Sequence, residues 1–258
     1  MKKPINVIWS GPHKPNWGDE LNKTLVNYLS GSEVHYGTHV DKHYLCIGSI
    51  LRLANKNSIV WGSGFIKENE KAEGEGLFLA VRGPLSRNKL LDQGFSCPQI
   101  YGDPALLLPR FYNPHITKKY KLGIIPHYID QDNEWLDQFK DNPSVNIINI
   151  LNPNVLEFVD EIKKCEVILS SSLHGIICGD AYGIPSYWIE LSDKVIGEGF
   201  KFRDYFLSVK RSKRSNYYIN ISTFKLNKTK FYDYKIDIDL DLLYQSCPFL
   251  KTNKVLNI

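Results

Sequence analysis

Residues 165–185 read CEVILSSSLHGIICGDAYGIP, and this stretch organises the chain. A short apolar run, 167–169, ends in three serines, and Leu173, His174 and Gly175 follow, leading into apolar residues at helical spacing. The pattern predicts a buried strand, a tight turn and a helix with His174 in its first turn.

A helix start at this place suits a bound anion, because it presents unpaired N–H groups and the positive end of the helix dipole. We expect Gly175 to permit close approach, and Ser171 and Ser172 to cap the helix or donate to the anion. His174 would lie beside the anion with a pKa near the working pH. The alternative is an ordinary capped helix with a half-buried histidine, and the spacing alone favours that alternative.

The length and composition of the chain limit its fold and its possible functions. A chain of 258 residues can form one large domain or two of ordinary size, and a net charge of +4 is too small to indicate nucleic-acid binding. No apolar run approaches the ~18 residues that span a membrane, and the N-terminal MKKPINVIWSG reads as a first strand rather than a signal peptide. Five cysteines without CxxC spacing disfavour zinc and a disulfide framework, so we expect a cytoplasmic protein.

Apolar runs alternate with helical patterns along most of the chain. In the first half we expect strands at 5–10, 44–47, 58–61 and 77–81, and helices at 19–29 and 84–93. In the second half we expect strands at 122–125, 145–150, 167–169 and 187–189, and helices at 133–139, at 154–164 and from 174. This alternation predicts a parallel, doubly wound α/β sheet in each half, joined by the polar segment 113–121.

Ligands of open parallel sheets bind outside the carboxyl ends of the strands. Those ends carry Asn16, Asp19, Ser63, Arg82, His127, residues 171–174, Glu190 and Lys194. Two sheets facing each other would point these residues into one cleft. Arg82, Lys194 and a helix start together describe a site for a small, multiply charged anion.

Each of these residues also has a structural interpretation. Arg82 could equally form a structural salt bridge, His127 could be a loop histidine, and Asn16 and Asp19 could form a turn before a helix. The chain also contains a basic cluster, which could be a solvated face or could bind phosphate groups or a membrane surface. Its members are Lys201, Arg203, Lys210, Arg211, Lys213 and Arg214.

Six segments in colinear order over residues 5–208 carry a resemblance to a known family. They are Asn-Trp-Gly-Asp-Glu-Leu (16–21), Ile-Val-Trp-Gly-Ser-Gly-Phe (59–65), Val-Arg-Gly-Pro (81–84), Gly-Asp-Pro-Ala-Leu-Leu (102–107), Ser-Ser-Leu-His-Gly (171–175) and the later Lys194. Together they resemble the polysaccharide pyruvyl transferase family. The resemblance implies two Rossmann-like, doubly wound domains facing a central cleft, as in the glycosyltransferase-B fold. We place these domains at residues 1–115 and 116–210, with a tail at 211–258 that packs back on them.

The resemblance also implies an activity, the transfer of the enolpyruvyl unit of phosphoenolpyruvate to a sugar as a ketal. The acceptor would be a hexose of a surface polysaccharide or of its lipid-linked precursor, with no cofactor or metal. A lipid-linked acceptor would allow contact with the inner face of the cytoplasmic membrane.

By the resemblance, Arg82 is the arginine of the Arg-Gly-Pro motif, and Leu173 and His174 are the Leu-His pair. Many members carry an arginine before that pair, where this chain has Ser172, and Lys194, Lys201 or Arg203 would have to replace its charge. We assign catalysis to Arg82 and His174, with His174 as the acid–base group and His127 as the second choice. Substrate binding is assigned to Asn16, Asp19, Ser63, Gly64, His127, Ser171, Ser172, Leu173, Gly175 and Lys194.

Two alternatives stay open at this point. One is a nucleotide-sugar glycosyltransferase of the same fold, because Glu190 and Glu198 have the seven-residue gap of its retaining members, although Gly197 and Gly199 disfavour one clean helix face there. The other is a non-catalytic protein that binds a sugar or an anion.

Overall fold

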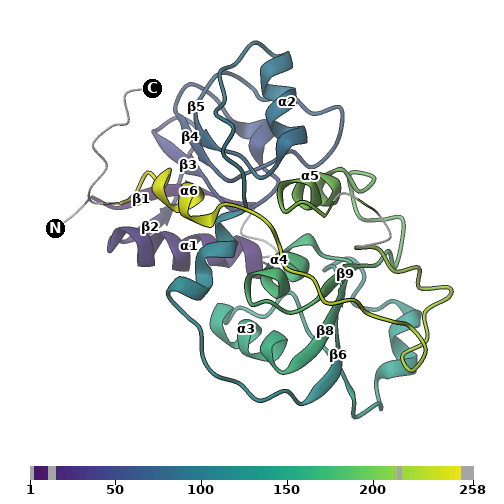
Figure 1. Ribbon diagram of the computed structural model, residues 1–258. Coiled ribbons are helices and arrows are strands. Elements are labelled where there is room, and N and C mark those ends of the chain that lie inside the picture. The colour runs from purple at the N-terminus through teal and green to yellow at the C-terminus, as the bar shows by residue number, and fades with distance from the viewer. Residues whose placement is uncertain (1–2, 11–15, 212, 214–216, 251–258) are drawn as a thin grey trace.

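The computed structural model describes residues 3–10, 16–211, 213 and 217–250, and it confirms an α/β fold with parallel sheets. One sheet has the strand order β2 (Val34–Tyr36), β1 (Ile5–Ile8), β3 (His43–Leu45), β4 (Ser58–Trp61), β5 (Leu77–Ala80). The other has the order β7 (Val145–Ile147), β6 (Tyr120–Ile125), β8 (Cys165–Ser170), β9 (Ser186–Trp188). In Figure 1 the first sheet lies in the upper half of the molecule and the second in the lower half.

The helices begin and end at the residues that cap them. In α1 (Trp17–Ser30) the Asn16 side chain accepts hydrogen bonds at the start, and Gly31 ends the helix in the left-handed region at φ 60°. The next predicted helices are confirmed as α2 (Pro84–Asp92), α3 (Val155–Lys163) and α4 (Leu173–Ala181). The helix predicted over 133–139 is a 3-10 helix, η3 (Glu134–Phe139).

Several elements lie where the sequence patterns predict none. They are β2, the 3-10 helices η1 (Leu51–Leu53) and η2 (Pro104–Arg110), and the helices α5 (Phe200–Ser208) and α6 (Leu240–Gln245). The most consequential is α5, because it is a wall of the cavity described below. It overlaps the predicted basic cluster, of which Lys201 and Arg211 are buried.

The two sheets share their largest hydrophobic cluster. Trp17 of α1 stacks on Phe158 of α3 with ring centroids 5.3 Å apart, and its indole N–H donates to the Val155 carbonyl at 3.0 Å. Burying two large aromatic rings at this contact stabilises the packing of the first helix against a helix of the second sheet. The carboxyl ends of the two sheets are thereby held close to each other.

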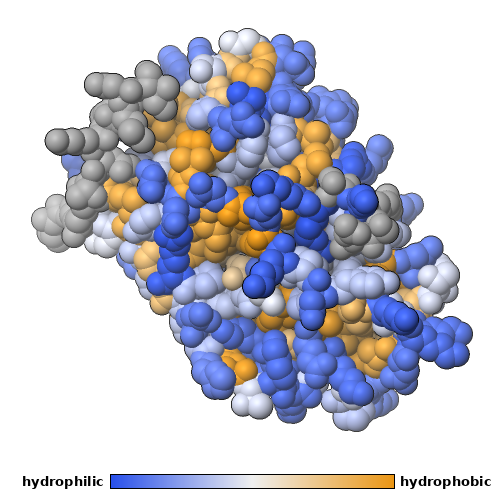
Figure 2. Space-filling view, viewed as in Figure 1, coloured by the Kyte–Doolittle hydropathy of each residue, from blue (hydrophilic) through white to orange (hydrophobic). Residues whose placement is uncertain are grey.

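The described part of the tail, 213 and 217–250, runs from the second sheet to the first. Tyr217 stacks on Phe206 with centroids 3.9 Å apart, Tyr234 donates to the Asp180 carboxylate, and the Trp61 indole N–H donates to the Leu243 carbonyl at 3.0 Å. Figure 2 shows hydrophobic side chains across the middle of one face, in the region of α6 and the tail.

Some predictions stay without a test. The proposed division into domains at 115/116 and 210/211 is one of them. Residues 11–15, between the first predicted strand and helix, and Arg214 of the basic cluster lie outside the described residues. In the described part of the chain, no helix combines the length and the apolar character needed to cross a bilayer.

Candidate active site

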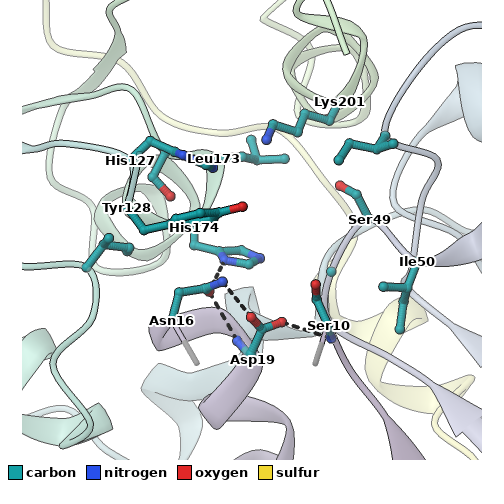
Figure 3. A pocket seen from close by; sticks show the side chains of 14 residues that line it. Ser10, Asn16, Asp19, Ser49, Ile50, His127, Tyr128, Leu173, His174 and Lys201 are labelled. Atoms are coloured by element: carbon teal, nitrogen blue, oxygen red, sulfur yellow. Dashed lines mark hydrogen bonds between the residues drawn. The ribbon is translucent and has the colours of Figure 1, made fainter. Parts of the chain in front are cut away.

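A cavity of about 110 Å³ lies between the carboxyl ends of the two sheets (Figure 3). The segments that follow β1, β3, β4, β6, β7 and β8 contribute to it, together with the starts of α1 and α5. Its lining is Ser10, Asn16, Asp19, Gly48, Ser49, Ile50, Ile66, His127, Tyr128, Ile150, Ser172, Leu173, His174 and Lys201. Six predicted site residues therefore come together here: Asn16, Asp19, His127, Ser172, Leu173 and His174.

Asn16 fixes the tautomer of His174. Its Oδ1 accepts from the backbone N–H groups of Gly18 (3.0 Å) and Asp19 (3.3 Å), and its Nδ2 donates to the Asp19 carboxylate. These three bonds set which end of the amide is oxygen, so the 2.7 Å contact from Oδ1 to His174 Nδ1 has the imidazole as donor. The Nε2 atom of His174 is then the nitrogen that can accept a proton.

Gly18 allows the imidazole to lie directly on α1. A Cβ atom at this position would be 2.3 Å from both Cε1 and Nδ1 of His174, far inside van der Waals contact. Gly18 and His174 thus lie against each other although 156 positions separate them in the chain. Gly18 belongs to α1, which follows a strand of the first sheet, and His174 belongs to α4, which follows a strand of the second. The turn predicted at Asn16 and Asp19 gives no indication of this contact between Gly18 and His174.

Both histidines of the cavity are neutral at pH 7. Burial, assisted by the charges of Lys201 and Arg82, lowers the pKa of His174 to about 3, and burial and Lys201 lower the pKa of His127 to about 3. The prediction of a His174 pKa near the working pH is therefore wrong. An anion in the cavity would favour the charged imidazole and raise both pKa values.

Lys201 supplies the positive charge of the cavity. It lies in the first turn of α5 and lines the cavity opposite His174 (Figure 3). Burial, with a smaller contribution from Arg82, lowers its pKa to about 8, so the ammonium form predominates at pH 7. Of the three candidates to replace the family arginine, Lys194 is exposed and lines a different cavity, and Arg203 donates to the Glu198 carbonyl at 2.7 Å.

Arg82 lies behind the cavity, fully buried and paired with Asp204 of α5. Its Nε and Nη2 atoms are 3.2 Å and 3.1 Å from Asp204 Oδ2, and Nη2 also donates to the Phe65 carbonyl at 2.6 Å. This is the structural salt bridge that was the alternative for Arg82. Direct contact of Arg82 with a ligand stays a prediction.

Arg82 nonetheless reaches the cavity through Ser49. Its Nη1 donates to Ser49 Oγ at 2.6 Å, and Ser49 lines the cavity. Because a lone pair of this hydroxyl is taken by the guanidinium, its own proton is available to an acceptor inside the cavity. Gly64 packs on the guanidinium, and Ser63 Oγ donates to the Gly48 carbonyl at 2.9 Å, so these two predicted residues support the wall and do not line it.

The start of α4 contributes backbone donors. Ser172 makes no side-chain cap, which leaves the first-turn N–H groups of this nine-residue helix without a partner from the N-cap residue. Ser171 points elsewhere: its hydroxyl accepts from the His127 backbone N–H at 2.8 Å and donates to Asp130 at 2.8 Å. The role expected for Gly175 is wrong, because its open side faces Ser170 Oγ and Ile125 of the sheet and not the cavity.

Among the described residues, no group of three His, Cys, Asp or Glu side chains is placed to hold a metal ion. The cavity combines one ammonium group, one positioned proton acceptor and several N–H and O–H donors. This arrangement can bind a small anion and move protons beside it.

Comparison with known proteins matches residues 7–193 to a family described as polysaccharide pyruvyl transferase. The chain is 30% identical over 247 residues to "Uncharacterized protein L143" of Acanthamoeba polyphaga mimivirus, covering 88% of this chain and 83% of that protein. It is 27% identical over 209 residues to "Succinoglycan biosynthesis protein ExoV" of Rhizobium meliloti (strain 1021), covering 76% of this chain and 62% of that protein. The family match includes every lining residue of the cavity except Lys201.

Proposed function

Because the chain belongs to the polysaccharide pyruvyl transferase family, we propose that it transfers the enolpyruvyl group of phosphoenolpyruvate to a hexose. The hexose belongs to a surface polysaccharide or its lipid-linked precursor, and the product is a cyclic ketal. A relative named for succinoglycan biosynthesis supports the polysaccharide part of this proposal. The single observation that carries it is the convergence of Lys201, the His174 imidazole and the start of α4 on one cavity.

The charges of the donor fit this cavity. Phosphoenolpyruvate carries a carboxylate and a phosphate, which need cations or N–H donors at two places. The Lys201 ammonium and the first-turn N–H groups of α4 offer two such places, and the Ser49 hydroxyl offers a further donor. Burial of these groups strengthens each contact with the anion, because the local dielectric is low.

In the first step, a hydroxyl of the hexose bonds to C2 of the enol while C3 gains a proton and becomes a methyl group. His174 Nε2 takes the hydroxyl proton, since Nδ1 is held as a donor by Asn16. The proton for C3 comes from a protonated group of the cavity, and Lys201 is a lining residue that holds one at neutral pH. The intermediate carries the sugar oxygen, the methyl, the carboxylate and the phosphate on one carbon.

In the second step, another hydroxyl of the same hexose displaces the phosphate from C2 and closes the ring. The bond from C2 to the phosphate oxygen breaks, and Lys201 takes the proton of the second hydroxyl and becomes an ammonium group again. The imidazolium of His174 gives its proton to the departing phosphate, so both groups return to their starting state. The Lys201 ammonium and the N–H groups of α4 stabilise the charge that develops on the departing phosphate. The sum is phosphoenolpyruvate plus a diol giving a ketal plus inorganic phosphate.

Turnover of the whole chain with phosphoenolpyruvate and a panel of methyl hexosides tests this function. We expect phosphate release that requires both substrates, together with one hexoside whose mass increases by a pyruvyl ketal. Phosphate release without the hexoside, or no release with any member of the panel, would contradict the proposal. Release of a nucleoside diphosphate from a nucleotide sugar in a parallel reaction would instead favour the glycosyltransferase alternative.

A further inference from the structure

Tyr128 lines the cavity, although neither the sequence patterns nor the proposed mechanism assigns it a role. It is half-buried in the loop 126–131, which follows β6, and its hydroxyl points into the cavity (Figure 3). Among the residues that the structure describes, none forms a hydrogen bond with this hydroxyl. A tyrosine hydroxyl away from the open surface usually has a hydrogen-bond partner, so this one is available to a molecule bound in the cavity.

The loop around Tyr128 holds its ring in place. The ring packs on the His127 imidazole with centroids 4.3 Å apart. The His127 backbone is bonded on both sides, because its N–H donates to Ser171 Oγ at 2.8 Å and its carbonyl accepts from the Asp130 N–H at 2.7 Å. The protein therefore positions the Tyr128 hydroxyl, which lowers the entropic cost of a contact between this hydroxyl and a ligand.

The cavity has a positive end and a negative end. Lys201 lies at one end and Asp19 at the other, with His174 between them (Figure 3). Asp19 is buried, and burial raises its pKa to about 7, so a carboxylate is present there above that pH. The ammonium group attracts a multiply charged anion and the carboxylate repels it, so the donor lies toward Lys201. The Tyr128 hydroxyl is on this side of His174 (Figure 3).

The two anionic groups of phosphoenolpyruvate then have different neighbours. In the proposed mechanism, the Lys201 ammonium and the first-turn N–H groups of α4 hold the phosphate as it departs. C2 lies close to His174, because Nε2 takes the proton of the sugar hydroxyl that attacks this carbon. The carboxylate is bonded to C2, so it also lies beside His174, where the Tyr128 hydroxyl points into the cavity (Figure 3).

We propose that the Tyr128 hydroxyl donates a hydrogen bond to the carboxylate of the donor, and that this contact selects an enol phosphate that carries a carboxylate on C2. The inference rests on the proposed function, to which it adds a residue that determines specificity for the donor. The carboxylate keeps its charge when C2 is attacked, so the contact is as strong in the bound donor as in the transition state. Its loss therefore raises the KM for phosphoenolpyruvate and leaves kcat nearly unchanged.

The test compares the whole chain with its Tyr128→Phe variant, which removes the hydroxyl and keeps the ring on His127. Tyr28→Phe is the matched control, because Tyr28 is exposed, stacks on Phe111 with centroids 5.7 Å apart and lies outside the cavity. Calorimetry measures binding of phosphoenolpyruvate and of vinyl phosphate, which is the same enol ester without the carboxylate. We expect the parent chain to bind vinyl phosphate at least about tenfold more weakly than phosphoenolpyruvate. Tyr128→Phe should bind phosphoenolpyruvate about tenfold or more weaker than the parent chain does, with vinyl phosphate binding unchanged, and Tyr28→Phe should bind both as the parent chain does.

Three results would overturn the inference: equal phosphoenolpyruvate binding by Tyr128→Phe and the parent chain, equal binding of the two esters by the parent chain, or an equal loss of both esters in Tyr128→Phe. In turnover, a lower kcat at an unchanged KM would also overturn it. Failure of the proposed function gives a different result. If phosphoenolpyruvate binding depends on Tyr128 but no hexoside takes up a pyruvyl group, the cavity recognises the carboxylate and the pyruvyl transfer is refuted. No binding of phosphoenolpyruvate by the parent chain would refute both.

Discussion

The contact between Gly18 and His174 leads to a sharp prediction for the variant Gly18→Ala. A methyl group at this position would be 2.3 Å from the imidazole, whereas ordinary contacts begin at 3.4 Å, so the ring has to retreat by about 1 Å. That movement would break the 2.7 Å hydrogen bond to Asn16, which holds the tautomer of His174. A misplacement of about 1 Å in a reacting group costs about 10²-fold in rate.

The loss in rate should come without a loss in folding. Alanine is favoured over glycine in a helix by about 1 kcal/mol, which offsets part of the steric cost to α1. We therefore expect kcat for phosphate release to fall about 10²-fold while the midpoint of thermal unfolding changes little. Gly74→Ala is the matched control, because the nearest atom to its new methyl group would be 3.7 Å away. A normal kcat for Gly18→Ala would refute the placement of His174 as the proton acceptor.

Three further predictions follow from the same geometry. His174→Ala should lower kcat by at least about 10²-fold with folding intact. The control variant His115→Ala, outside the cavity, should leave kcat unchanged. Equal kcat values for the two variants would remove His174 from the mechanism. The charged form of Lys201 predominates below its pKa of about 8, so the KM for phosphoenolpyruvate should be lowest below that pH and rise about tenfold per pH unit above it. A KM that does not change with pH would contradict a role for this ammonium group. Arg82→Ala and Asp204→Ala should each lower the free energy of unfolding by about 3–5 kcal/mol in urea titrations, because each leaves a buried charge unpaired, and the double variant should lose less than their sum.

The strands and most helices could be predicted because the local signals agree with the fold. The apolar run of β8, the proline that opens α2 and the glycine that ends α1 each act within a few residues of the element they define. Strand ends of a parallel sheet also collect ligand groups, which is why six lining residues could be named from position alone.

What could not be predicted depends on contacts between distant segments. Arg82 and Asp204 are 122 residues apart, and no local pattern pairs them. The helix α5 was missed because Lys201 was interpreted as a member of a basic cluster, whereas Lys201 is buried at the cavity and Asp204 of the same helix is buried in the ion pair. The site is thus formed by charged side chains that are buried, although charged side chains usually lie at the protein surface.

Calorimetric titration of phosphoenolpyruvate into the whole chain and into its Lys201→Gln variant tests the central claim most directly. The cavity between the two sheets should bind one phosphoenolpyruvate per chain, and loss of the ammonium group should weaken that binding by at least about tenfold, because a buried charge-assisted contact disappears. Lys213→Gln, at an exposed position, should bind as the parent chain does. Equal affinity of the parent chain and Lys201→Gln, or no binding by either, would contradict the assignment of this cavity to the donor.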